Sequence, residues 1–245
     1  MFENSNLSIK QKKHFILTKN KFYATTFLFL GIMLLSLMSM TMVFTSTNWI
    51  FQDLQRAKRL LYIAIGTSFS LFIVSFFFRR KMSTSIGFAL FIVVPWTLSL
   101  SFLASSSISI YLTLNQNNVL KSLAIIAIPG ATLIVIGLLS WFNIFKFWKL
   151  YSFLIFGTFG LIIFSIVSFF IFNSVLHTIY SVLAYIIFSL WIGFDIWIIQ
   201  KKAEYIQTYE REITISAFLA LALTSAFSIF IDVVNLVLIT ADLLR

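Results

Sequence analysis

Seven long apolar stretches constrain the fold of this chain more than any other feature of its sequence. A helix needs about 20 consecutive apolar residues to cross a lipid bilayer. Stretches of about that length lie near 23–44, 60–78, 86–108, 119–140, 150–172, 176–199 and 214–241. Transmembrane strands are not expected, because no alternating pattern of about ten residues recurs. The sequence predicts an all-α membrane protein, with a basic cytoplasmic arm over 1–22 and one seven-transmembrane-helix bundle over 23–245.

The composition excludes several classes of function. Hydrophobic residues make up 60% of the chain and charged residues 11%, whereas a soluble domain has about 45–50% and about 25%. The chain has no cysteine, so disulfides, thiolate metal sites and cysteine nucleophiles are excluded. Its two histidines, His14 and His177, are too few and too far apart for a zinc site. The net charge of +10 is explained by basic loops on one side of the membrane, and no nucleic-acid partner is expected.

Those basic loops predict the orientation, because Lys and Arg are enriched in short cytoplasmic loops. With the N-terminus inside, the arm and the three inner loops hold 13 of the 18 basic residues. The cluster from Arg56 to Arg59 is the main exception, since it lies in the first outer loop. The chain is therefore predicted to have its N-terminus inside and its C-terminus outside. Abundant Phe, Ile, Lys and Asn are typical of AT-rich bacterial genomes, which points to a bacterial source. The expected location is the bacterial plasma membrane.

Two carboxylates lie where membrane helices rarely carry charge. Of the eight acidic residues, only Asp195 and Asp232 have apolar residues closely packed on both sides. An Asp near the centre of a membrane helix costs roughly 2.5–3.5 kcal/mol on insertion scales. This cost falls if the two residues face each other, share a proton or bind a cation, and a pair that shares one proton would respond to pH near neutrality. The sequence therefore predicts a polar site between the last two helices.

The last predicted helix carries a polar stripe at the same place. Ser225, Ser228, Asp232 and Asn235 follow one another at intervals of 3, 4 and 3 residues, which puts them on one helical face. Carboxylate, amide and hydroxyl oxygens are the ligands that Ca²⁺ accepts. A hydrogen-bonded patch between helices, with no role in transport, explains the stripe equally well.

Two of the residues near this site have alternative interpretations. Asp195 could turn towards the inner surface and pair with a lysine near Lys201 instead of with Asp232. Arg79 ends the second helix at the inner face, where it either sets the topology or covers the carboxylates from inside.

Polar residues near the outer surface are expected to have structural roles. The serines between Ser99 and Ser109 either line a wet vestibule or mark a soft helix end. His177 is expected in the membrane interface, while Asp53 and Asp242 are expected at helix ends.

No set of catalytic residues is present. The chain lacks Gly-x-Ser-x-Gly, His-Glu-x-x-His and a glycine-rich phosphate loop. It also lacks the Tyr-Asp and Gly-x-Gly-Asp motifs of an intramembrane aspartyl protease. The chain is therefore not expected to be an enzyme.

Three segments resemble a known family. Ser181–Asp195 resembles the sixth helix of the Bax inhibitor-1 (transmembrane BAX inhibitor motif) family. Ala226–Leu236 contains Asp-x-x-Asn-Leu and resembles that family's seventh helix, and Phe78–Lys81 is similar to its helix 2–3 junction. The resemblance implies a seven-helix ion pathway, a pH-sensitive Ca²⁺ leak in which two paired aspartates are sensor and gate. An arginine of the second helix would interact with that pair.

Carried over to this chain, the resemblance names a set of gate residues. The aspartate pair, which would also mark the Ca²⁺ path, is Asp195 and Asp232, and the arginine is Arg79, with Arg80 as the alternative. Ser228 and Asn235 are associated with this gate. No tightly bound cofactor is implied. Ca²⁺ is the expected permeant ion, and the expected partners are the lipid bilayer, Ca²⁺, protons and membrane proteins that the sequence does not identify.

The chain departs from the family pattern in two respects. The two aspartates are 37 residues apart, more than is usual in the family. If the sixth helix ends near 199 and the seventh begins near 214, Asp195 and Asp232 lie about 6–9 Å and about 27 Å from the inner ends of their helices. Pairing then requires the sixth helix to continue beyond Gln200 or the seventh to begin in the cytoplasm. In addition, Phe230 stands where the family has Tyr, so a hydroxyl is lost.

Two other functions are compatible with the same residues. The same aspartates could relay protons in a proton-coupled secondary transporter of another solute. Alternatively, the chain could be a non-conducting membrane protein that acts by binding partners.

Overall fold

The structure, a computed structural model, consists of long helices in the parts that it describes, which are residues 18–47, 53–114, 119–142, 144, 146–170, 174–209 and 213–244. Seven of these helices are long and apolar enough to cross a membrane. They are α1 (Lys19–Thr47), α3 (Leu54–Phe77), α5 (Ile86–Leu114), α6 (Val119–Trp141), α7 (Tyr151–Phe170), α8 (Ser174–Thr208) and α9 (Ile215–Leu243). The predicted seven-helix membrane fold is confirmed. The predicted arm over 1–22 lies mostly outside the described residues, and α1 begins within it.

Two short elements that were not predicted join the spans. Helix α4 (Arg79–Thr84) follows α3 directly, so the basic run Arg79–Lys81 forms a helical turn of its own. The 3₁₀ helix η1 (Phe147–Leu150) precedes α7. Both contain basic residues, which are expected at a membrane surface.

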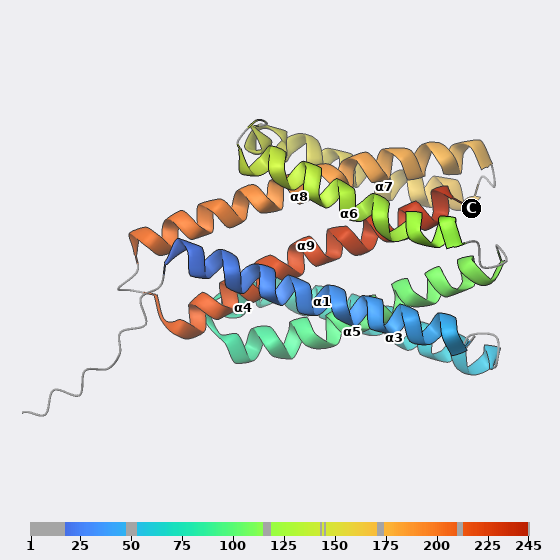
Figure 1. The fold of residues 1–245 in the computed structure, drawn as a ribbon, viewed down its shortest axis with the longest axis horizontal. Coiled ribbons are helices and arrows are strands. Elements are labelled where there is room, and N and C mark those ends of the chain that lie inside the picture. The colour runs from blue at the N-terminus through green and yellow to red at the C-terminus, as the bar shows by residue number, and fades with distance from the viewer. Residues whose placement is uncertain are drawn as a thin grey trace, which may run out of the picture.

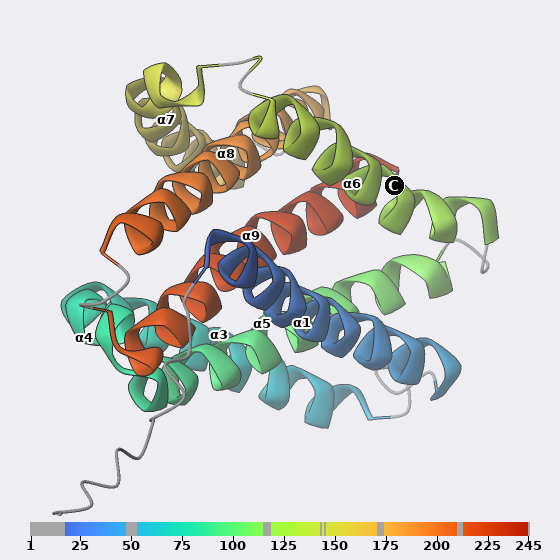
Figure 2. The same ribbon diagram turned by 60° about the vertical axis from the view of Figure 1, so that its left-hand side comes forward.

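Helix α9 lies in the centre of the bundle. In Figures 1 and 2 it runs between one group formed by α6, α7 and α8 and another formed by α1, α3 and α5. It contacts α1, α4, α5, α6 and α8. Two thirds of its apolar window (67%) is buried, against 6% for α3. The helix that carries the predicted polar stripe is therefore the most enclosed span of the seven.

The outer helices present large apolar side chains to the surroundings. Phe69 and Phe76 of α3 and Phe156 and Phe159 of α7 are all exposed. In a bilayer this exposure carries no penalty, because lipid chains are as apolar as the side chains. The apolar surface is thus the face that the protein presents to lipid.

Side-chain caps fix the starts of α3 and α9. The Asp53 carboxylate accepts a hydrogen bond from the Arg56 backbone N–H at 2.9 Å. The Thr214 hydroxyl accepts one from the Ala217 backbone N–H at 3.2 Å. Each cap satisfies a backbone donor that the first helical turn leaves free. Asp53 is thus a helix-end residue, as predicted.

The serine-rich part of α5 packs against α1 and neither lines a vestibule nor ends the helix. Three polar pairs join the two helices: Ser101 with Ser36 (3.2 Å), Ser105 with Thr41 (2.9 Å) and Ser109 with the Phe44 carbonyl (3.2 Å). Their near-constant sequence offset shows that α1 and α5 run parallel. Small hydroxyl residues let membrane helices approach closely and bond across the interface.

Helix α8 is longer than predicted at its C-terminal end, and this changes the depth of Asp195. The predicted end near 199 was wrong, since α8 continues to Thr208. Asp195 therefore lies 13 residues, or about 20 Å, from that end. Asp232 lies 17 residues, or about 26 Å, from the start of α9. Because α8 continues beyond Gln200, the two carboxylates can lie at similar depths in the membrane.

The seven candidate spans of the described residues predict that the segments before α1 and after α9 lie on opposite sides of the membrane, and the basic residues predict which side each segment occupies. Because the chain has no cysteine, single cysteines can report on the sides. Ser5→Cys should react with a membrane-impermeant maleimide only after cells are permeabilised, whereas Asn117→Cys should react in intact cells. Labelling in the reverse pattern would contradict the orientation. Ala226→Cys, at a fully buried position of α9, is the unreactive control.

Candidate functional site

Polar side chains hold α8 and α9 together along an antiparallel seam. Three pairs join the helices: Ser181 with Asp242, Asp195 with Ser228, and Lys202 with Ser225. As the residue number falls on α9 it rises on α8, as antiparallel packing requires. We call this contact the α8–α9 seam. In the predicted orientation, Lys202 lies near its inner end and Asp242 near its outer end.

The two predicted carboxylates lie in the middle of the α8–α9 seam. Asp195 and Asp232 are each only 8% exposed. The Ser228 side chain hydrogen-bonds to the Asp195 carboxylate, and the charges of the two aspartates act on each other. Ser228 and Asp232 are four residues apart and so share one face of α9. The structure therefore brings Asp195, Asp232 and Ser228 together.

Apolar side chains surround these polar groups. Phe230, Ile229 and Ile192 are fully buried beside the carboxylate positions. The ring of Phe227 packs on that of Trp96 of α5, with centroids 4.9 Å apart. Charges interact more strongly in such surroundings than in water, because little solvent screens them. The state of the carboxylates therefore depends on the few polar groups in contact with them.

Lys202 is a member of this site that the sequence did not single out. Its Nζ donates a hydrogen bond to the Ser225 hydroxyl at 2.8 Å. Its charge is attracted by Asp195, which lies seven residues, or two helical turns, away on the same face of α8, and is repelled by Arg79. The expected alternative partner of Asp195, a lysine near Lys201, is thus present together with Asp232. In the sequence, the seven-residue spacing between Asp195 and Lys202 was the signal that could have placed the lysine on the same helical face.

The remaining predicted residues lie at the edges of the site. Arg79 is exposed at the start of α4, which packs on α9. Its positive charge acts on the site by repelling the charge of Lys202. Arg80 is also exposed. Asn235 is half-buried on α9, three residues beyond Asp232 towards the predicted outer end.

The position of α8 is fixed just before Asp195 by two contacts. The Ser140 hydroxyl of α6 donates a hydrogen bond to the Gly193 carbonyl at 2.7 Å. The buried ring of Phe147, from η1, packs directly against the Gly193 backbone, where a Cβ atom would overlap it. Gly193 is needed for this close approach, two residues before the carboxylate.

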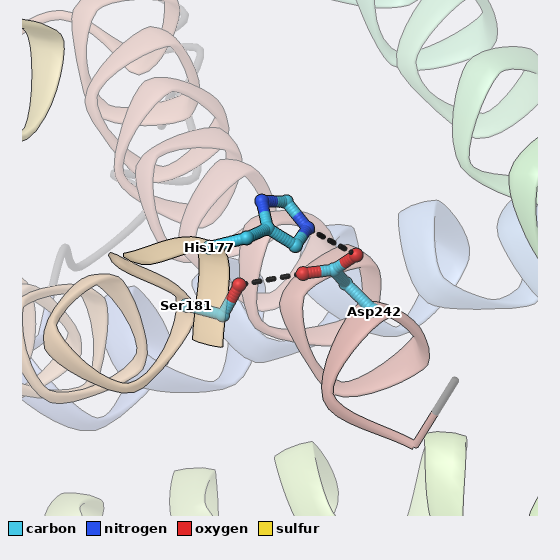
Figure 3. A network of polar contacts seen from close by, with 3 residues as sticks. All are labelled: His177, Ser181 and Asp242. Carbon is cyan, nitrogen blue, oxygen red and sulfur yellow. Dashed lines mark hydrogen bonds and ion pairs between the residues drawn. The ribbon is translucent and has the colours of Figure 1, made fainter. Parts of the chain in front are cut away.

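A second polar network lies at the predicted outer end of the α8–α9 seam. His177 and Ser181 of α8 both point at the Asp242 carboxylate of α9 (Figure 3). His177 Nε2 lies 2.8 Å from Asp242 Oδ1, and the Ser181 hydroxyl donates to Oδ2 at 2.5 Å. The serine therefore bonds to the carboxylate and not to the histidine, so it is not activated as a nucleophile. The network ties the end of α9 to the start of α8, and Asp242 is a helix-end residue, as predicted.

Comparison with known proteins places the chain in a family. The architecture defines a multi-pass integral membrane protein with charged residues buried between its helices. The family model described as inhibitor of apoptosis-promoting Bax1 matches residues 19–245. The chain therefore belongs to the Bax inhibitor-1 family, and the resemblance seen in the sequence is confirmed. No curated protein matches the chain.

Membership of this family settles one further expectation. Bax inhibitor-1 proteins are non-enzymatic membrane proteins, so the chain is not an enzyme, as predicted. The membrane in which it lies and the source organism stay predictions.

The close contact at Gly193 yields a stability prediction. Gly193→Ala should lower thermal stability in detergent, because the new methyl group overlaps the buried Phe147 ring and overpacking costs about 1–3 kcal/mol. Gly160→Ala in α7 is the matched control, since a Cβ there would meet nothing within 4 Å. Equal melting temperatures for the two variants would contradict the role assigned to Gly193.

Proposed function

We propose that this protein is a pH-sensitive cation leak, with Ca²⁺ as the permeant ion, in which Asp195 and Asp232 are sensor and gate. The observation that carries the proposal is their position. Both carboxylates are buried in the α8–α9 seam, within range of each other's charge, and the Ser228 side chain hydrogen-bonds to one of them. The cost of burying two such groups is otherwise unexplained.

The chemistry of the pair makes it sensitive to protons. Two carboxylates close together in apolar surroundings cannot both ionise cheaply, so they share a proton. When that proton leaves, the pair becomes a doubly negative set of oxygens, which attracts a divalent cation. Protons and Ca²⁺ therefore compete for Asp195 and Asp232, and the flux of one depends on the concentration of the other.

The site suits a passing cation better than a resident one. Ca²⁺ takes about 6–8 oxygen ligands when it is bound tightly. In the described parts of the chain, no group of three or more His, Cys, Asp or Glu side chains lies close enough together to hold a metal. Two carboxylates with the nearby Ser228 hydroxyl fall short of a tight site, so a cation there would leave again.

The proposal predicts a flux that depends on pH through both aspartates. Ca²⁺ entry into liposomes that contain the purified protein should differ between about pH 6 and about pH 8. Asp195→Asn and Asp232→Asn should each alter the flux and abolish most of its pH dependence, because a neutral amide keeps the shape and cannot exchange the proton. Asp53→Asn is the control, since Asn also caps helices and position 53 lies outside the seam.

Different outcomes separate the alternatives. A pH-dependent flux that both seam variants leave unchanged would contradict the assignment of the gate. If Ca²⁺ does not pass, but another solute follows a proton gradient, the protein is a proton-coupled transporter that uses the same pair as a relay. If nothing passes, from protein shown to be folded, it acts by binding partners.

A further inference from the structure

We infer that Lys202 is a built-in cation that occupies the inner end of the α8–α9 seam and keeps other cations out. This inference rests on the proposed function, because it names the residue that closes the path on the inner side. It assigns to Lys202 the covering role that the sequence had suggested for Arg79.

The hydrogen bonds at Ser225 show that the Lys202 ammonium is held in place. Ser225 is 2% exposed, and its hydroxyl donates to the Leu221 carbonyl at 2.6 Å. Its oxygen is then free to accept from Lys202 Nζ, at 2.8 Å. The hydroxyl group therefore has a defined direction, and its acceptor side faces the lysine.

The charges near Lys202 follow one another from the surface inwards. Arg79 is exposed at the predicted inner surface and repels Lys202, while Asp195 attracts it. Lys202 lies seven residues, or about 10 Å, nearer than Asp195 to the inner end of α8. A cation that enters from inside therefore meets two positive groups before it reaches the first carboxylate. Like charges placed in this way reduce the local concentration of cations.

The neighbouring lysine shows that this placement depends on the helical face. Lys201 is 54% exposed and bonds to Glu204 of its own helix at 2.7 Å. Its charge faces away from the seam, although it is adjacent in sequence. Lys201 is therefore a matched control, with the same side chain at nearly the same depth.

The lysine side chain can block the inner end of the seam and can also move away from it. Its ammonium group is a compact charge on a flexible four-carbon stem, without the planar fork that fixes an arginine. If the ammonium leaves Ser225, the inner end of the seam is vacated and the carboxylates become accessible to another cation.

The test compares Ca²⁺ flux through wild type, Lys202→Gln, Lys202→Arg and Lys201→Gln in liposomes at about pH 7. Lys202→Gln should raise the flux about tenfold or more, because it removes the charge and can still bond to Ser225. Lys202→Arg keeps the charge and should not raise the flux above wild type, and Lys201→Gln should stay close to wild type. Flux through Lys202→Gln within about twofold of wild type, while Asp195→Asn alters the flux, would overturn the inference and leave the proposed function intact.

A second measurement does not depend on conduction. If Lys202 occupies the position of a cation, Lys202→Gln should bind Ca²⁺ and gain a Ca²⁺-dependent rise in melting temperature that wild type and Lys201→Gln lack. If neither wild type nor Lys202→Gln conducts Ca²⁺ but Lys202→Gln shows this rise in melting temperature, the result would support the role of Lys202 and reject the proposed Ca²⁺ leak. A Lys202→Gln variant that shows neither the higher flux nor the rise would overturn the inference.

Discussion

The burial of Asp195 and Asp232 is the interaction on which the rest of the structure depends. Each carboxylate would cost several kilocalories per mole if it stood alone in an apolar environment. For Asp195, a hydrogen bond from Ser228 and the opposite charge of Lys202 offset part of this cost, whereas the two aspartates repel each other when both are charged. All of these groups come from α8 or α9. Those two helices must therefore pack in one register, and the other spans enclose them.

This dependence explains why polar contacts, and not apolar ones, determine how the helices pair. Lipid chains and Phe or Leu side chains are equally apolar, so the hydrophobic effect gives membrane helices little reason to choose one neighbour over another. Hydroxyl and charged groups do favour particular neighbours, because in an apolar environment they need hydrogen-bonding or charged partners. The α8–α9 seam is fixed by three polar pairs, and the α1–α5 contact by serines such as Ser101 and Ser105. The candidate site thus lies at the contact that most needs polar partners.

The sequence predicted the spans well because their number depends on apolar length alone. It underestimated α8, because Lys201 and the residues after it read as a polar loop, while in the structure they continue the helix to Thr208. At 35 residues, or about 52 Å, α8 exceeds the apolar thickness of about 30 Å. Its last turns therefore need no apolar character, and no hydropathy pattern could have placed their end.

The candidate site was predicted in part for a similar reason. Asp195, Asp232 and Ser228 could be named because charge and periodicity within an apolar run are visible in one dimension. Lys202 resembled a topological charge beside Lys201, and only the packing of α8 on α9 distinguishes the half-buried lysine that bonds to Ser225 from the exposed one. The contacts of His177 and Ser181 with Asp242 likewise depend on the register of α8 on α9.

We propose above all that Asp195 and Asp232 titrate as one unit. The most direct test is the infrared absorption of the carboxyl C=O groups, followed against pH in wild type, Asp195→Asn, Asp232→Asn and the double variant. Coupling predicts that each single substitution changes the titration of the remaining aspartate, so that the two single effects do not add up to the double effect. Independent, additive titrations would contradict the claim that a shared proton joins α8 to α9.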